Sequence, residues 1–173
     1  MKVTSSLANK LLKQLNEEKD YWLNKEKESM LYTATADEDP VIPEYDYEGV
    51  SATLDEIDRK ICKIKHAINT SNINSEIEVA GEKYTVDMLL VRMSQLTKRK
   101  LTLDKMRKQL PKSRVEDSGY FSAKRSVVEY RYTNYDVEKV KRDFEEVSKT
   151  LFEMQMKLDV HNQTVQFDVD IEE

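Results

Sequence analysis

Glycine and proline are scarce in this chain of 173 residues, which contains only three of each. Proline interrupts helices, and glycine is needed for phosphate-binding loops and many tight turns. Their scarcity therefore argues against glycine-rich phosphate loops and against a β-sandwich. Few turns and long helices are expected instead. The balance of 39% hydrophobic and 35% charged residues is typical of thin helices that each carry one apolar stripe.

Cysteine and long apolar runs are also scarce. The single cysteine, Cys62, excludes an internal disulfide and has no Cys or His neighbour at metal-ligand spacing, which favours an inert thiol. No run approaches the ~18 apolar residues of a membrane span, and the first twenty residues lack the apolar core of a signal peptide. The sequence therefore predicts a soluble, cytoplasmic protein.

Catalytic and cofactor-binding motifs are missing too. The chain contains no G-x-S-x-G sequence, no P-loop and no dinucleotide-binding fingerprint. Its two histidines, His66 and His161, lack the neighbouring ligands of a helical metal site. We expect no catalytic residue, no metal ligand and no cofactor, and we predict a protein that is not an enzyme.

Apolar residues at alternating steps of three and four mark the last predicted helix, residues 136–162. They are Val137, Val140, Phe144, Val147, Leu151, Met154 and Leu158. This is the a and d spacing of a helix that buries one narrow seam. Three more helices are predicted, over residues 5–32, 53–70 and 85–110, and Thr53 to Glu56 forms a capping box at the start of the second. The predicted fold is mainly α, a single domain of residues 1–173 in which four long helices form an up-and-down, coiled-coil-like bundle.

Three other segments connect or follow these helices. Residues 33–50 form an acidic loop with two prolines and no basic residue. Residues 76–84 alternate about Gly81 and predict a small β-hairpin. The tail, residues 164–173, alternates again and predicts a strand. We expect the tail to extend the hairpin into a small sheet at one end of the bundle, with apolar side chains of the tail packing on those of the hairpin, namely Val165, Phe167 and Val169 on Ile77 and Val79.

A polar cluster is predicted at the same end of the bundle. With helices that alternate in direction, Asn69, Asn72 and Asn162 should converge there, and Arg92 near the start of the third helix is the fourth member of the candidate cluster. Asparagines at helix ends also cap carbonyl groups and tolerate left-handed backbone. The cluster is therefore either a polar ligand site or a set of helix caps.

The strongest charge imbalance in the sequence lies between Arg92 and Arg114. This segment contains nine basic residues and one acidic residue, Asp104. The candidate anion-binding side chains are Lys98, Arg99, Lys100, Lys105, Arg107 and Lys108. Such a face could neutralise phosphates of a nucleic acid. Against this stand the net charge of -5 and the absence of interleaved aromatic residues. The acidic loop could instead cover the basic face, within one chain or between chains.

Additional apolar residues flank the predicted seams: Leu12, Leu90, Leu101, Phe152 and Met156. They leave more apolar surface than one thin bundle covers, which predicts a homo-oligomer, most simply a dimer. The preferred prediction is a self-associating helical scaffold. The alternative is an anion-binding or nucleic-acid-binding module that uses the basic face 92–114.

An ordered set of residues is similar to a known family. The set comprises Ile68-Asn69-Thr70-Ser71-Asn72, Gly81 in the hairpin, the helix opening from Thr85 to Arg92, Arg125-Ser126, and Asn162 at the end of the last helix. Together they resemble the bacterial septicolysin-like family, helical proteins of no established activity, over about Leu54 to Asn162. Met93 and Gln163 depart from the family pattern. The family name implies a cytolysin-like activity, although the sequence contains no segment typical of membrane insertion.

Overall fold

The computed structural model describes residues 1–37, 39–115 and 128–171. The helices are α1 (Ser5–Ser29), α2 (Tyr47–Asn74), α3 (Val86–Arg107) and α4 (Val137–Thr164). The strands are β1 (Lys2–Thr4), β2 (Glu76–Val79), β3 (Glu82–Thr85), β4 (Lys112–Arg114), β5 (Tyr130–Tyr132) and β6 (Gln166–Asp168). Of the described residues, 65% are helical, which confirms the mainly helical fold with small antiparallel strand pairs.

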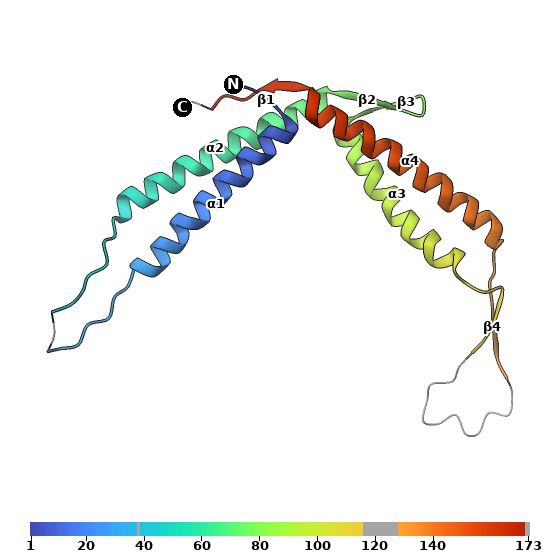
Figure 1. Cartoon of the computed structure of the whole chain (residues 1–173), viewed down its shortest axis with the longest axis horizontal. Coiled ribbons are helices and arrows are strands. Elements are labelled where there is room, and N and C mark those ends of the chain that lie inside the picture. The colour runs from blue at the N-terminus through green and yellow to red at the C-terminus, as the bar shows by residue number, and fades with distance from the viewer. Residues whose placement is uncertain (38, 116–127, 172–173) are drawn as a thin grey trace. The chain divides into compact units, whose positions relative to one another are not determined.

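Two compact units divide the chain. Unit 1 contains Met1–Glu76 and Leu158–Glu173, and unit 2 contains Ile77–Lys157. Within unit 1, α1 and α2 lie side by side as an antiparallel helical hairpin (Figure 1). In unit 2, α3 forms a similar antiparallel hairpin with the part of α4 that ends at Lys157 (Figure 1). The packing of all four helices into one bundle, and the single domain of residues 1–173, stay predictions.

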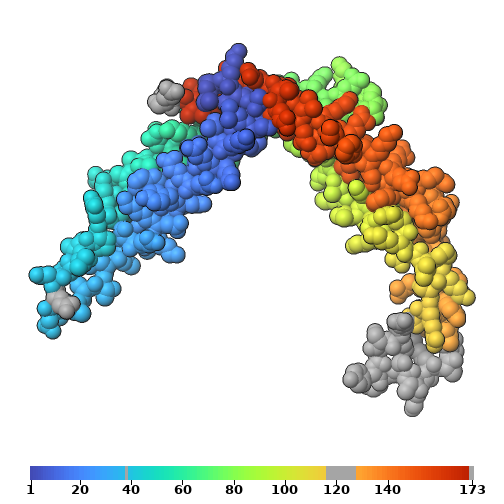
Figure 2. Space-filling model, in the orientation of Figure 1, coloured from blue at the N-terminus to red at the C-terminus, as the bar shows by residue number. Residues whose placement is uncertain are grey.

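The core of unit 1 lies between α1 and α2. The predicted seam residues Ile57, Ile61 and Ile64 of α2 are buried, together with Ala8 and Leu12 of α1. Side chains of α1 and α2 fill the space between these helices (Figure 2). The prediction that Leu12 provides surplus apolar surface is therefore wrong, because this side chain belongs to the core.

The tail strand pairs with the N-terminal strand, and the predicted pairing of the tail with the hairpin 76–84 is wrong. β6 runs antiparallel to β1, with Val3 opposite Phe167. The Met1 ammonium donates to the Val169 carbonyl at 2.7 Å, and the Val169 amide donates to the Met1 carbonyl at 2.9 Å. Because Lys2–Thr4 offers a backbone edge directly before α1, the tail finds its partner there. Val3 and Val169 then close the core of unit 1 with 1% exposure each, whereas Val165, which was predicted to be buried, is exposed.

Helix α2 begins earlier and ends later than the sequence indicates. It starts at Tyr47, and the hydroxyl of Thr53 donates to the Gly49 carbonyl at 2.8 Å instead of capping the first turn. Burial of Val50 stabilises the additional turn, because apolar surface is removed from water there. Residues 47–50 of the predicted acidic loop are consequently helical. At the other end, α2 continues to Asn74, so Asn69 and Asn72 lie inside the helix.

Unit 2 is built on the α3–α4 hairpin. Leu89, Leu96 and Leu103 of α3 are buried, as are Val140 and Met154 of α4. The predicted hairpin of β2 and β3 is confirmed, with Ala80 and Gly81 at positive φ values of 51° and 83° in the turn. The far end of the helical hairpin carries a two-stranded ribbon of β4 and β5. Among the described helices, none is both long and apolar enough to span a membrane.

Candidate functional site

Helix α4 carries a second row of residues at alternating steps of four and three, on the side opposite its buried seam. The six residues, hereafter the second seam, are Glu145, Lys149, Phe152, Met156, Asp159 and Gln163. All six are exposed in the chain. The two central residues are apolar, with Phe152 68% exposed and Met156 51% exposed. A helix that buries one apolar row and exposes large apolar side chains on its opposite side is suited to contact a second neighbour there.

The order of residues in the second seam is self-complementary. If an identical helix is placed antiparallel to it, with Phe152 opposite Met156, then Lys149 lies opposite Asp159 and Glu145 lies opposite Gln163. Two apolar pairs at the centre are thus followed on both sides by an opposite-charge pair and a pair able to form a hydrogen bond. This surface lies on one helix, and its geometry follows from helical periodicity alone. The arrangement suits a contact between two copies related by a twofold axis.

The predicted anion-binding residues of α3 fall into two groups. Lys98, Arg99, Lys105 and Lys108 are exposed. Lys100 and Arg107 lie instead over the ring of Phe144 in α4, with the Arg107 guanidinium carbon 4.0 Å from the ring centroid and the Lys100 Nζ 5.6 Å from it. Cation–π contacts of this kind cover the edge of the α3–α4 core. These contacts explain why two polar residues, Lys100 and Arg107, lie on the side of α3 that contacts α4.

Asp104 is the acidic residue of the basic segment 92–114, and it neutralises part of the positive charge of its neighbours Arg107 and Lys108. Its carboxylate accepts from Lys108 at 2.5 Å and from Arg107 at 2.7 Å. These hydrogen bonds and charges, with Lys108 as the larger cause, hold the pKa of Asp104 below its usual value. The basic residues of α3 are therefore not one uniform anion-binding face.

The four residues of the predicted polar cluster lie on three different helices. Asn69 and Asn72 lie in the last turns of α2, and Asn162 lies in the last turn of α4, all within unit 1. Arg92 lies on α3 in unit 2, where its Nη1 donates to the Gln95 side chain at 3.5 Å. The α2 C-terminus is closed by a backbone hydrogen bond from Ser75 to the Ser71 carbonyl at 3.0 Å. The convergence of the three asparagines stays a prediction.

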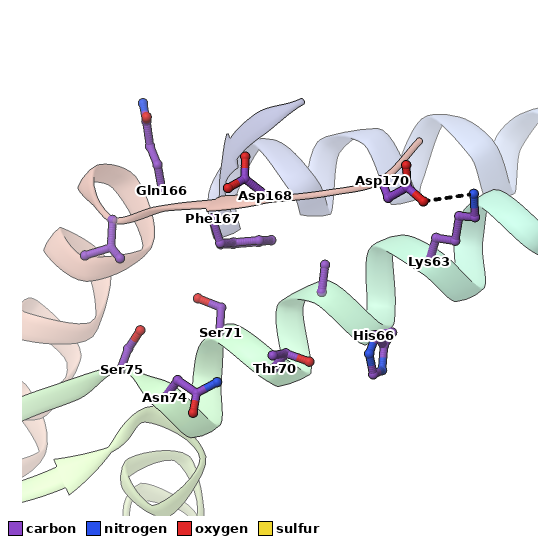
Figure 3. Close-up of a pocket in the computed structure, with 12 residues that line it drawn as sticks. Lys63, His66, Thr70, Ser71, Asn74, Ser75, Gln166, Phe167, Asp168 and Asp170 are labelled. Atoms are coloured by element: carbon purple, nitrogen blue, oxygen red, sulfur yellow. Dashed lines mark ion pairs between the residues drawn. The ribbon is translucent and has the colours of Figure 1, made fainter. Parts of the chain in front are cut away.

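A groove of about 580 Å³ lies between the C-terminal half of α2 and the tail strand in unit 1. In Figure 3 the ring of Phe167 lies beneath the strand, and Ser71 points toward it from α2. Lys63 and Asp170 form an ion pair of 3.5 Å at one end. In Figure 3 the hydroxyl of Ser71 and the ring of His66 lie on opposite sides of α2, so these two side chains do not form a nucleophile–base pair. Sequence reasoning missed this groove, because it depends on the pairing of β1 with β6.

One hydrogen bond, made by Tyr45, joins the predicted acidic loop to helix α1. The phenol of Tyr45 donates to the Glu26 carboxylate of α1 at 2.8 Å. This hydrogen bond, with partial burial and the negative charge of Glu26, raises the pKa of Tyr45 to about 12. Tyr45 thereby connects the loop to α1. Cys62 is exposed, and His161 is buried with neither ring nitrogen hydrogen-bonded among the described residues.

The architecture defines a class: a mainly helical protein with two antiparallel helical hairpins and short two-stranded ribbons. No protein-family model matches the chain, and no curated protein matches it. The chain is similar in structure to a functionally unknown conserved protein from Corynebacterium diphtheriae, with a TM-score of 0.63 and 12% sequence identity. The similarity covers 97% of this chain and 100% of the other. It shows a shared fold. Arg125 and Ser126, which are part of the sequence resemblance stated above, lie outside the described residues.

Proposed function

We propose that the protein is a non-enzymatic helical scaffold of the cytoplasm that forms homodimers, its two copies pairing antiparallel along α4. The observation that carries this proposal is the exposed, self-complementary second seam, with Phe152 and Met156 at its centre. Scattered single apolar side chains are normal on a protein surface, whereas Phe152 and Met156 lie four residues apart on one side of α4 and form a pair that matches the surface of a partner helix.

The energetics favour a partner that is a second copy. Each apolar pair at the centre removes an exposed phenylalanine and an exposed methionine from water, and the burial of such side chains contributes about 1.5–3 kcal/mol each. The Lys149 and Asp159 pairs at the rim add little affinity but fix the register and the antiparallel direction. Two α3–α4 hairpins that pair in this way place four helices side by side in the order α3–α4–α4–α3. The up-and-down bundle of this chain's own four helices, expected from the sequence, is a separate prediction.

Three other expectations remain part of the proposal as weaker alternatives. The exposed lysines and arginines of α3 support binding of polyanions, although Lys100 and Arg107 are engaged with Phe144. Contact between the acidic loop and these basic residues, within or between copies, would compete with that binding. Membership of the septicolysin-like family, with the cytolysin-like activity that its name implies, rests on the sequence resemblance alone.

A charge swap tests the antiparallel register. Lys149→Glu places two carboxylates opposite each other twice per dimer, and Asp159→Lys does the same with two ammonium groups, so each single variant should weaken dimerisation about tenfold. The double variant Lys149→Glu/Asp159→Lys restores opposite charges and should return the dissociation constant to within about threefold of the original. Sedimentation velocity over a concentration series measures this constant.

The matched control reverses a charge outside the second seam. Glu138 lies in the first turn of α4 and pairs with Lys141 at 2.6 Å. In the antiparallel register it lies opposite position 170, beyond the end of α4 at Thr164, so Glu138→Lys should leave the dissociation constant unchanged. A double variant that dimerises as weakly as the single variants would contradict the register. A protein that is monomeric in every form would contradict self-association itself.

A further inference from the structure

The ribbon of β4 and β5 brings basic and aromatic residues together on one face. Lys112 lies opposite Tyr132, and Arg114 lies opposite Tyr130. Side chains directly opposite each other in an antiparallel pair lie on the same face, and side chains two residues apart along a strand share that face. All four side chains therefore alternate, basic beside aromatic, over one face of the ribbon. Backbone hydrogen bonds from Val115 to Glu129 and from Thr133 to Pro111 extend the ladder at both ends.

This face is open to solvent. Tyr130 and Tyr132 are 47% and 62% exposed, and Lys112 and Arg114 are also exposed. The ammonium of Lys112 lies 4.1 Å from the ring centroid of Tyr130 and 5.6 Å from that of Tyr132. A positive charge is therefore held beside two exposed aromatic rings. The other face of the ribbon carries a further cation, Arg131.

We infer that this ribbon binds single-stranded nucleic acid, with two bases stacked on Tyr130 and Tyr132 and the adjoining phosphates paired with Lys112 and Arg114. Bases stack on exposed aromatic rings without regard to sequence, and basic side chains beside the rings follow the backbone. Lysine is suited to bind a phosphate beside these rings, because its flexible side chain lets the ammonium move from a ring face to the phosphate. This binding site lies outside the second seam of α4 and does not depend on dimerisation.

The occupant is a single strand because the rings need an unstacked base. In a duplex each base is already stacked above and below, so only phosphates and groove edges are accessible. A polyanion without bases, such as heparin, would contact Lys112 and Arg114 but gain nothing from the tyrosines. The tyrosines and the basic residues of the ribbon therefore make separate contributions to the affinity for a single strand, and each contribution can be measured.

Fluorescence anisotropy with labelled twelve-nucleotide poly-U RNA and poly-dT DNA tests the inference on the full chain. The unmodified protein should bind both strands and prefer them to a duplex of equal length. Tyr130→Ala/Tyr132→Ala should weaken binding about tenfold per tyrosine, whereas Tyr130→Phe/Tyr132→Phe should retain it, because phenylalanine stacks equally well. Lys112→Ala/Arg114→Ala should lower the slope of log K against log salt by about 1.4, since each phosphate contact on a single strand contributes about 0.7.

The control variant removes two exposed basic residues of α3 instead. Lys98→Ala/Arg99→Ala makes the same change in net charge, and it should leave the affinity within about twofold. An equal loss in this variant would overturn the inference, because it would place binding on α3 or on net charge. Absence of binding by the unmodified chain at low salt would overturn it too, as would alanine variants of the tyrosines that bind as tightly as the original protein. Circular dichroism of each variant confirms that the helices are retained.

Discussion

Replacement of Leu89 by alanine should lower the free energy of unfolding by about 2–5 kcal/mol, the cost of a cavity in a closely packed interior. The side chain of Leu89 is 0% exposed and lies on the buried face of α3 with Leu96 and Leu103. Urea titrations followed by circular dichroism at 222 nm, at one fixed protein concentration, measure the change.

The neighbouring leucine provides the matched control. Leu90 is 45% exposed, so Leu90→Ala removes the same atoms from the same turn and should cost about 0.5 kcal/mol or less. If Leu89→Ala and Leu90→Ala lowered the free energy of unfolding equally, the face of α3 that carries Leu89 would not be the one that contacts α4.

Replacement of Phe152 by aspartate should weaken self-association by about 100-fold or more while leaving the fold of the single chain intact. The phenyl ring is 68% exposed, so the chain alone loses little when it is removed. In the proposed dimer, however, the aspartate would place a carboxylate against Met156 of the other copy at two symmetry-related positions. An unpaired charge buried in an interface costs about 2–5 kcal/mol. Sedimentation velocity and circular dichroism, applied to the same samples, separate the two effects.

A second exposed apolar residue of unit 2 serves as the comparison. Met88 is 55% exposed and lies in the first turn of α3, where a carboxylate is favourable to the helix. Met88→Asp should therefore leave self-association unchanged. If Met88→Asp dissociated the dimer and Phe152→Asp did not, the interface would lie on α3, which would contradict the proposed contact through α4.

The helices could be predicted from the sequence because their signals are local. The steps of three and four in Ile57, Ile61 and Ile64 place these residues on one face, and the structure buries all three. Helix ends depended on weaker signals: Thr53 has the features of a capping residue, yet it lies inside α2 because Val50 extends the buried face upstream. Local chemistry alone does not reveal such a tertiary contact.

Strand pairing could not be predicted, because it joins segments far apart in the chain. The alternating tail fitted any open strand edge, and no strand was predicted before the helix of residues 5–32. In the structure Thr4 both ends β1 and caps α1, accepting from the Leu7 amide at 3.3 Å. The ribbon of β4 and β5 was missed for the same reason. No aromatic residues are interleaved with the basic segment in the sequence, and only the β4–β5 register places Tyr132 opposite Lys112.

The mass of the unmodified protein in solution tests the central claim most directly. Sedimentation equilibrium at micromolar concentration should give twice the chain mass of 20.3 kDa, about 40.6 kDa, and the mass should fall toward that of one chain on dilution. A mass of 20.3 kDa at every concentration up to the high micromolar range would contradict self-association through α4.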